Sequence, residues 1–120
     1  MKNLLLIFGA CVSNNSQATN LSDSSTFYFS QGMLEKNAKR YLTASSNFEK
    51  AIGLNKSYAE AYIENGLANK EMRKTDQAKA NFLKAYELQP TNNAVIKELT
   101  NLYYDYRQWD KAIEFASKCV

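Results

Sequence analysis

Residues 59–92 read AEAYIENGLANKEMRKTDQAKANFLKAYELQPTN, and this stretch decides the fold. Ala78, Phe82 and Ala85 follow one another at intervals of four and three residues, which places them on one face of a helix. Gly66 lies in an earlier segment, where the missing side chain lets two helix backbones approach closely. The stretch therefore predicts two helices packed against each other, with the Phe82 ring in the wedge beside them.

The same pattern recurs along the chain with a period of 34 residues. The matching positions are Tyr28 and Tyr62, Gly32 and Gly66, Phe48 and Phe82, Ala51 and Ala85, and Ala44 with Ala78 and Ala112. A period of this length that holds two helices is typical of one class of helical repeat. The chain resembles the tetratricopeptide repeat family over residues 25–58, 59–92 and, incompletely, 93–120.

The resemblance implies an all-α fold, a right-handed superhelical array of about three antiparallel helix-turn-helix hairpins. Glycine and proline are scarce, at four and one, which also disfavours an all-β fold. The expected helices cover residues 26–38, 41–54, 58–72, 75–88, 92–106 and 109–119. Ala85 is expected to let the next hairpin approach.

The third repeat departs from the family pattern. Ala116 and Cys119 stand where a phenylalanine and an alanine are usual. We expect Cys119 to pack as a small residue at an alanine position, and Tyr103 and Trp109 to fill the wedge between hairpins.

The end of the third repeat lacks the polar capping helix that the family usually adds. Ile113 is therefore expected to be exposed, and Tyr104 is expected to be an exposed aromatic residue suited to an interface. Three explanations compete: self-association through the uncapped C-terminal end, a chain cut from a longer protein, or a frayed last helix. We favour a truncated or naturally minimal array.

In this family the first helix of each repeat lines a concave groove that binds a peptide or protein. The corresponding residues here are Phe29, Met33, Lys36, Ile63, Leu67, Lys70, Lys97, Asn101 and Tyr104. Their apolar strip and lysines suit a peptide with apolar anchors and some acidic groups. The alternative is that they pack on the chain's own N-terminal segment or on a second copy.

Some family members clamp the C-terminal carboxylate of chaperones with lysine, asparagine and basic residues. The positions of that clamp are occupied here by Phe29, Met33, Glu64, Ala94 and Glu98. The clamp is therefore absent in register.

The N-terminus has a different character. Lys2, an apolar run over residues 4–8, and the small residues Gly9 and Ala10 precede Cys11. This order is that of a secretory signal, and the apolar run is shorter than the roughly 20 residues that span a bilayer. The end of the segment resembles the lipobox of bacterial lipoproteins.

That second resemblance implies that residues 1–10 are a signal peptide and that Cys11 is lipidated. Residues 11–24 would then form a polar tether. The implied localisation is the bacterial cell envelope, membrane-anchored and facing the periplasm or exterior. A soluble cytoplasmic adaptor, resembling a co-chaperone, is the alternative.

Composition argues against catalysis and nucleic-acid binding. The chain has no histidine, and its two cysteines are far apart, so we expect no catalytic residues, metal site or cofactor. The net charge of +3 comes from interleaved residues without a basic stripe. We therefore expect a protein-interaction scaffold and not an enzyme.

Overall fold

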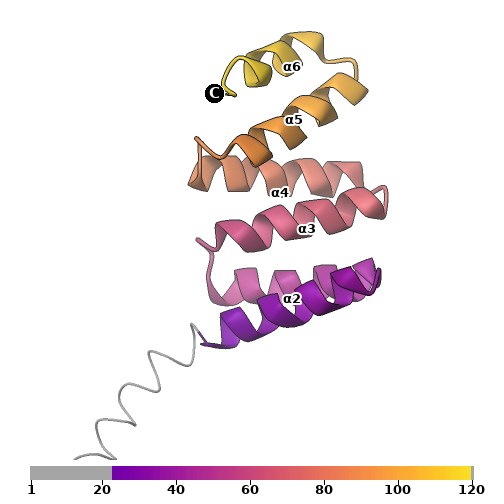
Figure 1. The fold of residues 1–120 in the computed structure, drawn as a ribbon, viewed down its shortest axis with the longest axis vertical. Coiled ribbons are helices and arrows are strands. Elements are labelled where there is room, and N and C mark those ends of the chain that lie inside the picture. The colour runs from indigo at the N-terminus through magenta and orange to yellow at the C-terminus, as the bar shows by residue number, and fades with distance from the viewer. Residues whose placement is uncertain (1–22, 120) are drawn as a thin grey trace, which may run out of the picture.

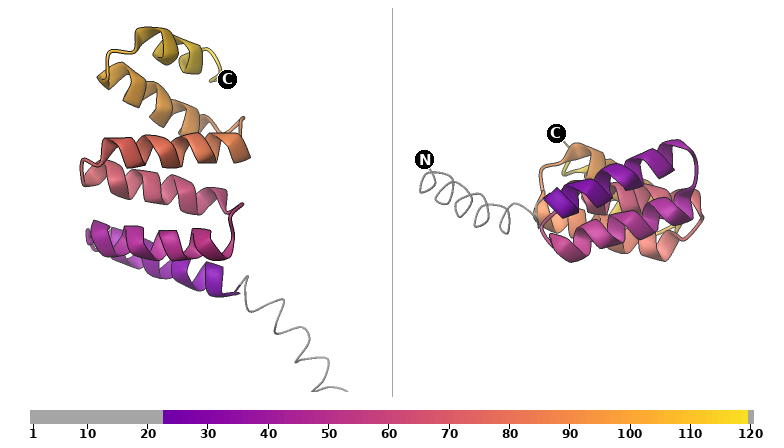
Figure 2. Two further views of the ribbon diagram at one scale, coloured as in Figure 1. Left: turned by 180° about the vertical axis from the view of Figure 1, so that it is seen from behind. Right: turned by 90° about the horizontal axis from the view of Figure 1, so that it is seen from below.

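The structure is a computed structural model that describes residues 23–119. Six helices fill this range, and they form a stack of three antiparallel hairpins (Figure 1). They are an unlabelled first helix over residues 23–37, α2 (Tyr41–Leu54), α3 (Ala59–Glu71), α4 (Thr75–Leu88), α5 (Asn93–Asp105) and α6 (Trp109–Ala116). The view from behind shows each helix lying beside the next one in the chain (Figure 2). The expected all-α helical repeat array is confirmed.

The expected helices agree with the structure except at their ends. The first helix already includes residues 23 and 24, which were assigned to the polar tether. At the other end of the stack, α6 stops at Ala116, although helix was expected as far as residue 119. The expected signal peptide and Cys11 lie outside the described residues.

Each hairpin turns through one residue with a left-handed backbone. Lys39, Arg73 and Arg107 have φ angles of 63°, 61° and 59°, and they are spaced by the repeat period. After each of them, an amide reaches back five residues to a helical carbonyl, as in the bond from Lys74 N to Asn69 O at 2.8 Å. This arrangement closes the end of a helix and satisfies carbonyls that would lack partners. The turn is thus built identically three times, without glycine.

A glycine and a phenylalanine hold together each of the first two hairpins. A Cβ atom added to Gly32 would lie 2.5 Å from the Phe48 ring, and one added to Gly66 would lie 2.7 Å from the Phe82 ring. Both rings are fully buried. Each ring therefore occupies space that any larger residue on the first helix would fill. The sequence predicted that Gly66 lets the helices approach closely, and the structure adds that the glycine faces the ring itself.

The third hairpin is held together differently. Its corresponding pair is Thr100 and Ala116, and the buried ring is supplied by Phe115, one position earlier. The Phe115 ring stacks on Tyr103 at 5.4 Å and meets the edge of Tyr86 at 5.3 Å. Tyr86 belongs to the preceding hairpin, so this ring turns back into the stack.

Three expectations for the last hairpin are confirmed and two are wrong. Tyr103 is buried, whereas Tyr104 and Ile113 are exposed, as expected. Trp109 does not fill the wedge, because Phe115 takes that role and leaves Trp109 about half exposed, at 48%. Cys119 is also exposed, because α6 ends before it and carries it out of the packing.

The contact between Gly66 and Phe82 predicts a sharp contrast between two Gly→Ala substitutions. Gly66→Ala should lower the free energy of unfolding by about 1–3 kcal/mol, because the buried ring has nowhere to move. Gly53→Ala is the matched control. Its added Cβ meets nothing within 4 Å, so the change should be neutral or stabilise α2 by up to about 1 kcal/mol.

Chemical denaturation of both variants measures the contrast. If Gly66→Ala were as stable as Gly53→Ala, the ring would not depend on the glycine.

Candidate functional site

The expected apolar strip divides between the two core clusters of the stack. Phe29 and Met33 are partly buried against the cluster of Ala44, Phe48 and Ala68. The Phe29 ring stacks on Tyr58 at 4.9 Å. Partial burial, with the carboxylate of Glu60 close by, raises the pKa of the Tyr58 hydroxyl. This end of the strip forms an aromatic cluster between the first two hairpins.

Ile63 and Leu67 also contribute to packing. Both are partly buried against the larger core cluster, which contains Phe82 and Leu99. The family positions predict that these side chains line the groove. Their packing against the core cluster shows that they also help to hold the hairpins together. Charged substitutions at these positions would disturb folding as well as any binding.

Two of the expected groove lysines form ion pairs across the hairpin junctions. Lys36 Nζ lies 2.5 Å from Glu64 Oε2, and Lys70 Nζ lies 2.8 Å from Glu98 Oε2. Both pairs join residues 28 apart, so the same bridge links the first helices of successive repeats. The carboxylates neutralise these lysines, which weakens the expected preference for acidic groups.

A hollow of about 420 Å³ lies beside the second of these bridges. It is bounded by side chains from α3, α5, the turn before α4 and the first residue of α4, namely Lys70, Arg73, Thr75, Glu98, Asn101, Leu102 and Asp105. Two predicted groove residues, Lys70 and Asn101, meet here. Arg73 and Asp105 add a charge of each sign, so the hollow offers hydrogen-bond donors and acceptors together.

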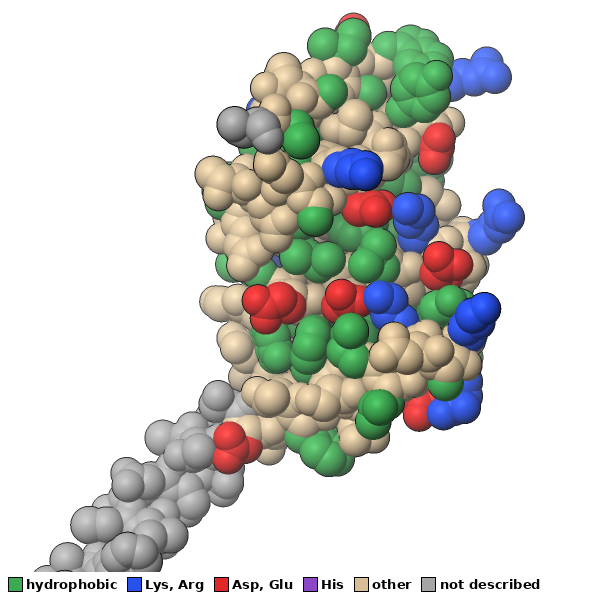
Figure 3. Space-filling model, viewed as in Figure 1, with side chains coloured by type: hydrophobic (Ala, Val, Ile, Leu, Met, Phe, Trp, Pro, Cys, Tyr) green, Lys and Arg blue, Asp and Glu red, His purple; other side chains and the backbone are tan. Residues whose placement is uncertain are grey.

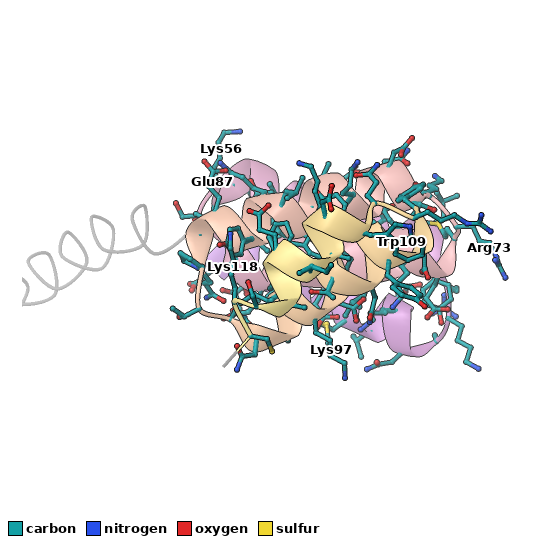
Figure 4. The ribbon with its side chains drawn as sticks, turned by 90° about the horizontal axis from the view of Figure 1, so that it is seen from above. Lys56, Arg73, Glu87, Lys97, Trp109 and Lys118 are labelled. Carbon is teal, nitrogen blue, oxygen red and sulfur yellow. The ribbon has the colours of Figure 1, made fainter. Side chains whose placement is uncertain are left out.

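Two other predicted residues lie apart from this hollow. Lys97 is exposed and points away from the stack (Figure 4). The Tyr104 ring meets the edge of Trp109 at 5.0 Å, at the C-terminal end of the stack. The nine predicted residues therefore form a line of separate features and not one pocket. Figure 3 shows positive and negative side chains next to each other over hydrophobic ones on one face.

A buried polar contact was not predicted from the sequence. The Ser45 hydroxyl donates a hydrogen bond of 2.6 Å to Asn65 Oδ1, which joins α2 to α3 inside the stack. The Asn65 amide reaches Asn81 of α4 at 3.5 Å. Within the described residues, no buried side-chain nitrogen or oxygen lacks a partner. These polar groups are thus structural, and they fix how adjacent helices align.

Residues 23–119 contain no group of three or more side chains that could together hold a metal ion. None of the helices in this range has the length and apolarity needed to cross a membrane.

Comparison with known families decides the classification. The family described as "Tetratricopeptide repeat" matches residues 25–58 and 59–92, which is more than half of the chain. The chain belongs to the tetratricopeptide repeat (TPR) family. The resemblance inferred from the 34-residue period is thereby confirmed.

Curated relatives and solved structures are consistent with this TPR assignment. RNA polymerase II-associated protein 3 of Homo sapiens is 33% identical over 64 residues, which are 53% of this chain and 10% of that protein. The chain therefore corresponds to about a tenth of the length of the curated relatives it matches.

Two solved structures illustrate the shared TPR fold. The crystal structure of MamA has a TM-score of 0.77 at 24% identity, covering 79% of this chain and 56% of MamA. The first TPR of Spaghetti (RPAP3), bound to the HSP90 peptide SRMEEVD, has a TM-score of 0.68 at 23% identity and covers 82% of this chain and 76% of that one. At these identities the likeness shows the fold alone.

The repeated ion pair predicts a small, salt-dependent coupling between α3 and α5. Glu98→Gln should lower the free energy of unfolding by less than about 1 kcal/mol, because a partly exposed pair is screened by solvent. Denaturation of Glu98→Gln, Lys70→Met and the double variant gives the coupling energy, which salt should reduce. A coupling of zero at low salt would show that this pair does not join the two helices.

Proposed function

We propose that this TPR chain is a protein-interaction scaffold that binds an extended peptide segment of a partner. The observation that carries the proposal is the charged hollow beside the bridge between Lys70 and Glu98. It lies at groove positions predicted from the family, and it presents donors and acceptors from three parts of the fold. A peptide with both polar side chains and free backbone groups suits such a surface.

The family assignment supports this reading. The TPR of Spaghetti was solved with a bound peptide, and a fold of the same type appears in a CopN-Scc3 complex. The ion pairs of Lys36 and Lys70 direct the proposal away from a strongly acidic peptide. Arg73 and Asp105, which line the hollow, suit a partner that carries charges of both signs.

The proposal is tested by filling the hollow from an exposed position. Asn101→Trp places a large ring in it and leaves the buried face of α5 unchanged. We expect the partner that co-purifies with the wild type in mild detergent to be lost. Ala80→Trp is the matched control, since Ala80 is exposed on α4 and lies outside the hollow.

Circular dichroism should show that both variants are folded. If Asn101→Trp retains the same partners as Ala80→Trp, the hollow is not the binding site.

A chaperone-tail adaptor is the alternative function, and it is favoured by the likeness to a TPR bound to SRMEEVD. The residues argue against it, because Glu64 and Glu98 stand where the clamp needs an amide and a base. Fluorescence anisotropy with labelled SRMEEVD should therefore show no saturable binding. Saturable binding that Asn101→Trp abolishes would establish the alternative.

We also propose that the scaffold is held at a bacterial membrane by lipid on Cys11. The sequence Phe8-Gly9-Ala10-Cys11 and the polar residues that follow it support this anchor. Several acyl chains would anchor stably, since each buried methylene contributes about 0.8 kcal/mol. Cys11→Ala should move the protein from the membrane fraction to the soluble fraction and leave the N-terminal segment uncleaved. An unchanged distribution would favour the soluble cytoplasmic adaptor.

A further inference from the structure

Apolar side chains are exposed at both ends of the described stack. At one end Phe27 and Leu34, on the helix over residues 23–37, are 57% and 60% exposed. At the other end Ile113 on α6 is 67% exposed. Figure 3 shows hydrophobic side chains at both ends of the molecule. Single exposed apolar residues are common on protein surfaces. Whether these residues form an interaction surface therefore depends on their positions in the repeat.

Phe27 and Leu34 occupy positions that are used for stacking elsewhere in the array. One period later these positions are Ala61 and Ala68, both fully buried, and two periods later they are Val95 and Leu102, exposed by 0% and 4%. Ala68 packs in one cluster with Ala44 and Phe48 of the preceding hairpin. The first helix thus carries the residues of a hairpin-stacking face.

Ile113 occupies the matching position on the opposite face. Its counterparts are Ser45, which hydrogen-bonds to Asn65 of the next hairpin, and Lys79, which lies 5.7 Å from the Tyr103 ring of the next hairpin. Both counterparts contact the first helix of the following hairpin. Ile113 is therefore placed to contact a first helix.

A hollow of about 320 Å³ beside Ile113 marks the absence of a ring. It is lined by Thr100, Tyr104, Trp109, Ala112, Ile113 and Ala116. Thr100 and Ala116 occupy the positions where the other hairpins have the glycine and the buried phenylalanine. The Phe115 ring does not line this hollow, and instead meets Tyr86 of the preceding hairpin. Figure 4 looks down onto α6, with Trp109 near one end of this surface and Lys118 near the other.

The two faces are complementary in size. Within the stack, the large Phe48 of α2 meets the small Ala68 of α3. At the two ends of the stack the sizes are reversed. The small Ala116 of α6 occupies the repeat position of Phe48, and the large Leu34 of the first helix occupies the position of Ala68. Leu34 of a second copy, placed as Ala68 is placed over Ala44 and Phe48, would lie against Ala112 and Ala116 and fill the hollow.

The charges are compatible with this contact. Within the stack, Lys36 pairs with Glu64 and Lys70 pairs with Glu98. At the new junction the lysine position is occupied by Tyr104 and the glutamate position by Ser30, and both residues are uncharged. Glu35, which would lie near the contact, is already bound by Arg40 through hydrogen bonds of 2.5 and 3.2 Å. Glu35 would therefore keep its partner in the contact.

We propose that copies of this chain associate head to tail, with the Phe27 and Leu34 face of one copy on the Ala112, Ile113 and Ala116 face of the next. The contact continues the packing of the hairpins from one molecule to another. Because its two faces differ, each copy keeps one free face, and the assembly grows beyond a dimer. The proposal uses neither the charged hollow nor its peptide, so it stands or falls separately from the proposed function.

The test blocks each face separately in the full 120-residue chain, under reducing conditions that keep the exposed Cys119 from cross-linking. Leu34→Glu blocks the first face and Ile113→Glu blocks the second. Leu42→Glu is the matched control, because Leu42 is 69% exposed but lies on α2, outside both faces. Circular dichroism checks the fold of each variant.

Sedimentation velocity gives the outcome. The wild type and Leu42→Glu should form species whose mass increases with concentration beyond that of a dimer. Each face variant alone should stay monomeric. An equimolar mixture of Leu34→Glu and Ile113→Glu should form a heterodimer and nothing larger, because only one complementary pair of faces survives.

Each contrary outcome overturns the proposal. A monomeric wild type would show that the faces do not meet. Association of either face variant alone would indicate contact between identical faces. A mixture that stays monomeric would show that the faces are not complementary. Loss of association in Leu42→Glu would show that replacing any exposed leucine by glutamate prevents association, so that the effect is not specific to the two faces.

Discussion

The contact between a glycine on one helix and a buried phenylalanine ring on the next supports the rest of this structure. In the first two hairpins the ring occupies space that only a residue without a side chain leaves open. Burying such a ring contributes on the order of 2–3 kcal/mol. The same ring lies under the next hairpin, so one contact fixes both the hairpin and the stacking. The predicted groove residues and the bridges between first helices take their positions from that stacking.

The third hairpin shows what happens when this contact is replaced. Thr100 and Ala116 replace the glycine and the phenylalanine of the other hairpins. A buried ring is supplied instead by Phe115, which stacks on Tyr103. The helix that carries the change is short, with 8 residues in α6 against 14 in α4. Its outer face retains Ile113, Trp109 and a hollow where a ring would lie. Two changes in the repeat pattern thus leave a hollow where the other hairpins have a buried ring.

The repeat period was sufficient to predict the hairpins, because small residues and rings recur at fixed positions that only one kind of packing uses. The sequence shows that Ala116 replaces the phenylalanine of the repeat pattern. It does not show that Phe115 supplies the buried ring, because the contact of Phe115 with Tyr86 depends on side-chain packing. Trp109 was misplaced for the same reason. Helix ends such as that of α6 depend on local contacts that periodicity does not describe.

The candidate site was less predictable than the fold. The bridges of Lys36 and Lys70 could have been found, since glutamates recur 28 residues after both lysines. The contact between Ser45 and Asn65 carried no such signal, because both residue types are common on exposed surfaces. Family positions identified Lys70 and Asn101, whereas the charged hollow between them became visible only when α3 and α5 were placed together.

Hydrogen exchange at α6 is the most direct measurement of the central claim. Thr100→Gly/Ala116→Phe installs the missing glycine and ring in the third hairpin, and Thr100→Gly alone is its reference. The amides of α6 should exchange more slowly in the double variant, because the ring would bind α6 to α5 as Phe82 binds α4 to α3. Equal exchange rates in the two variants would show that the glycine and the ring do not determine how the hairpins hold together.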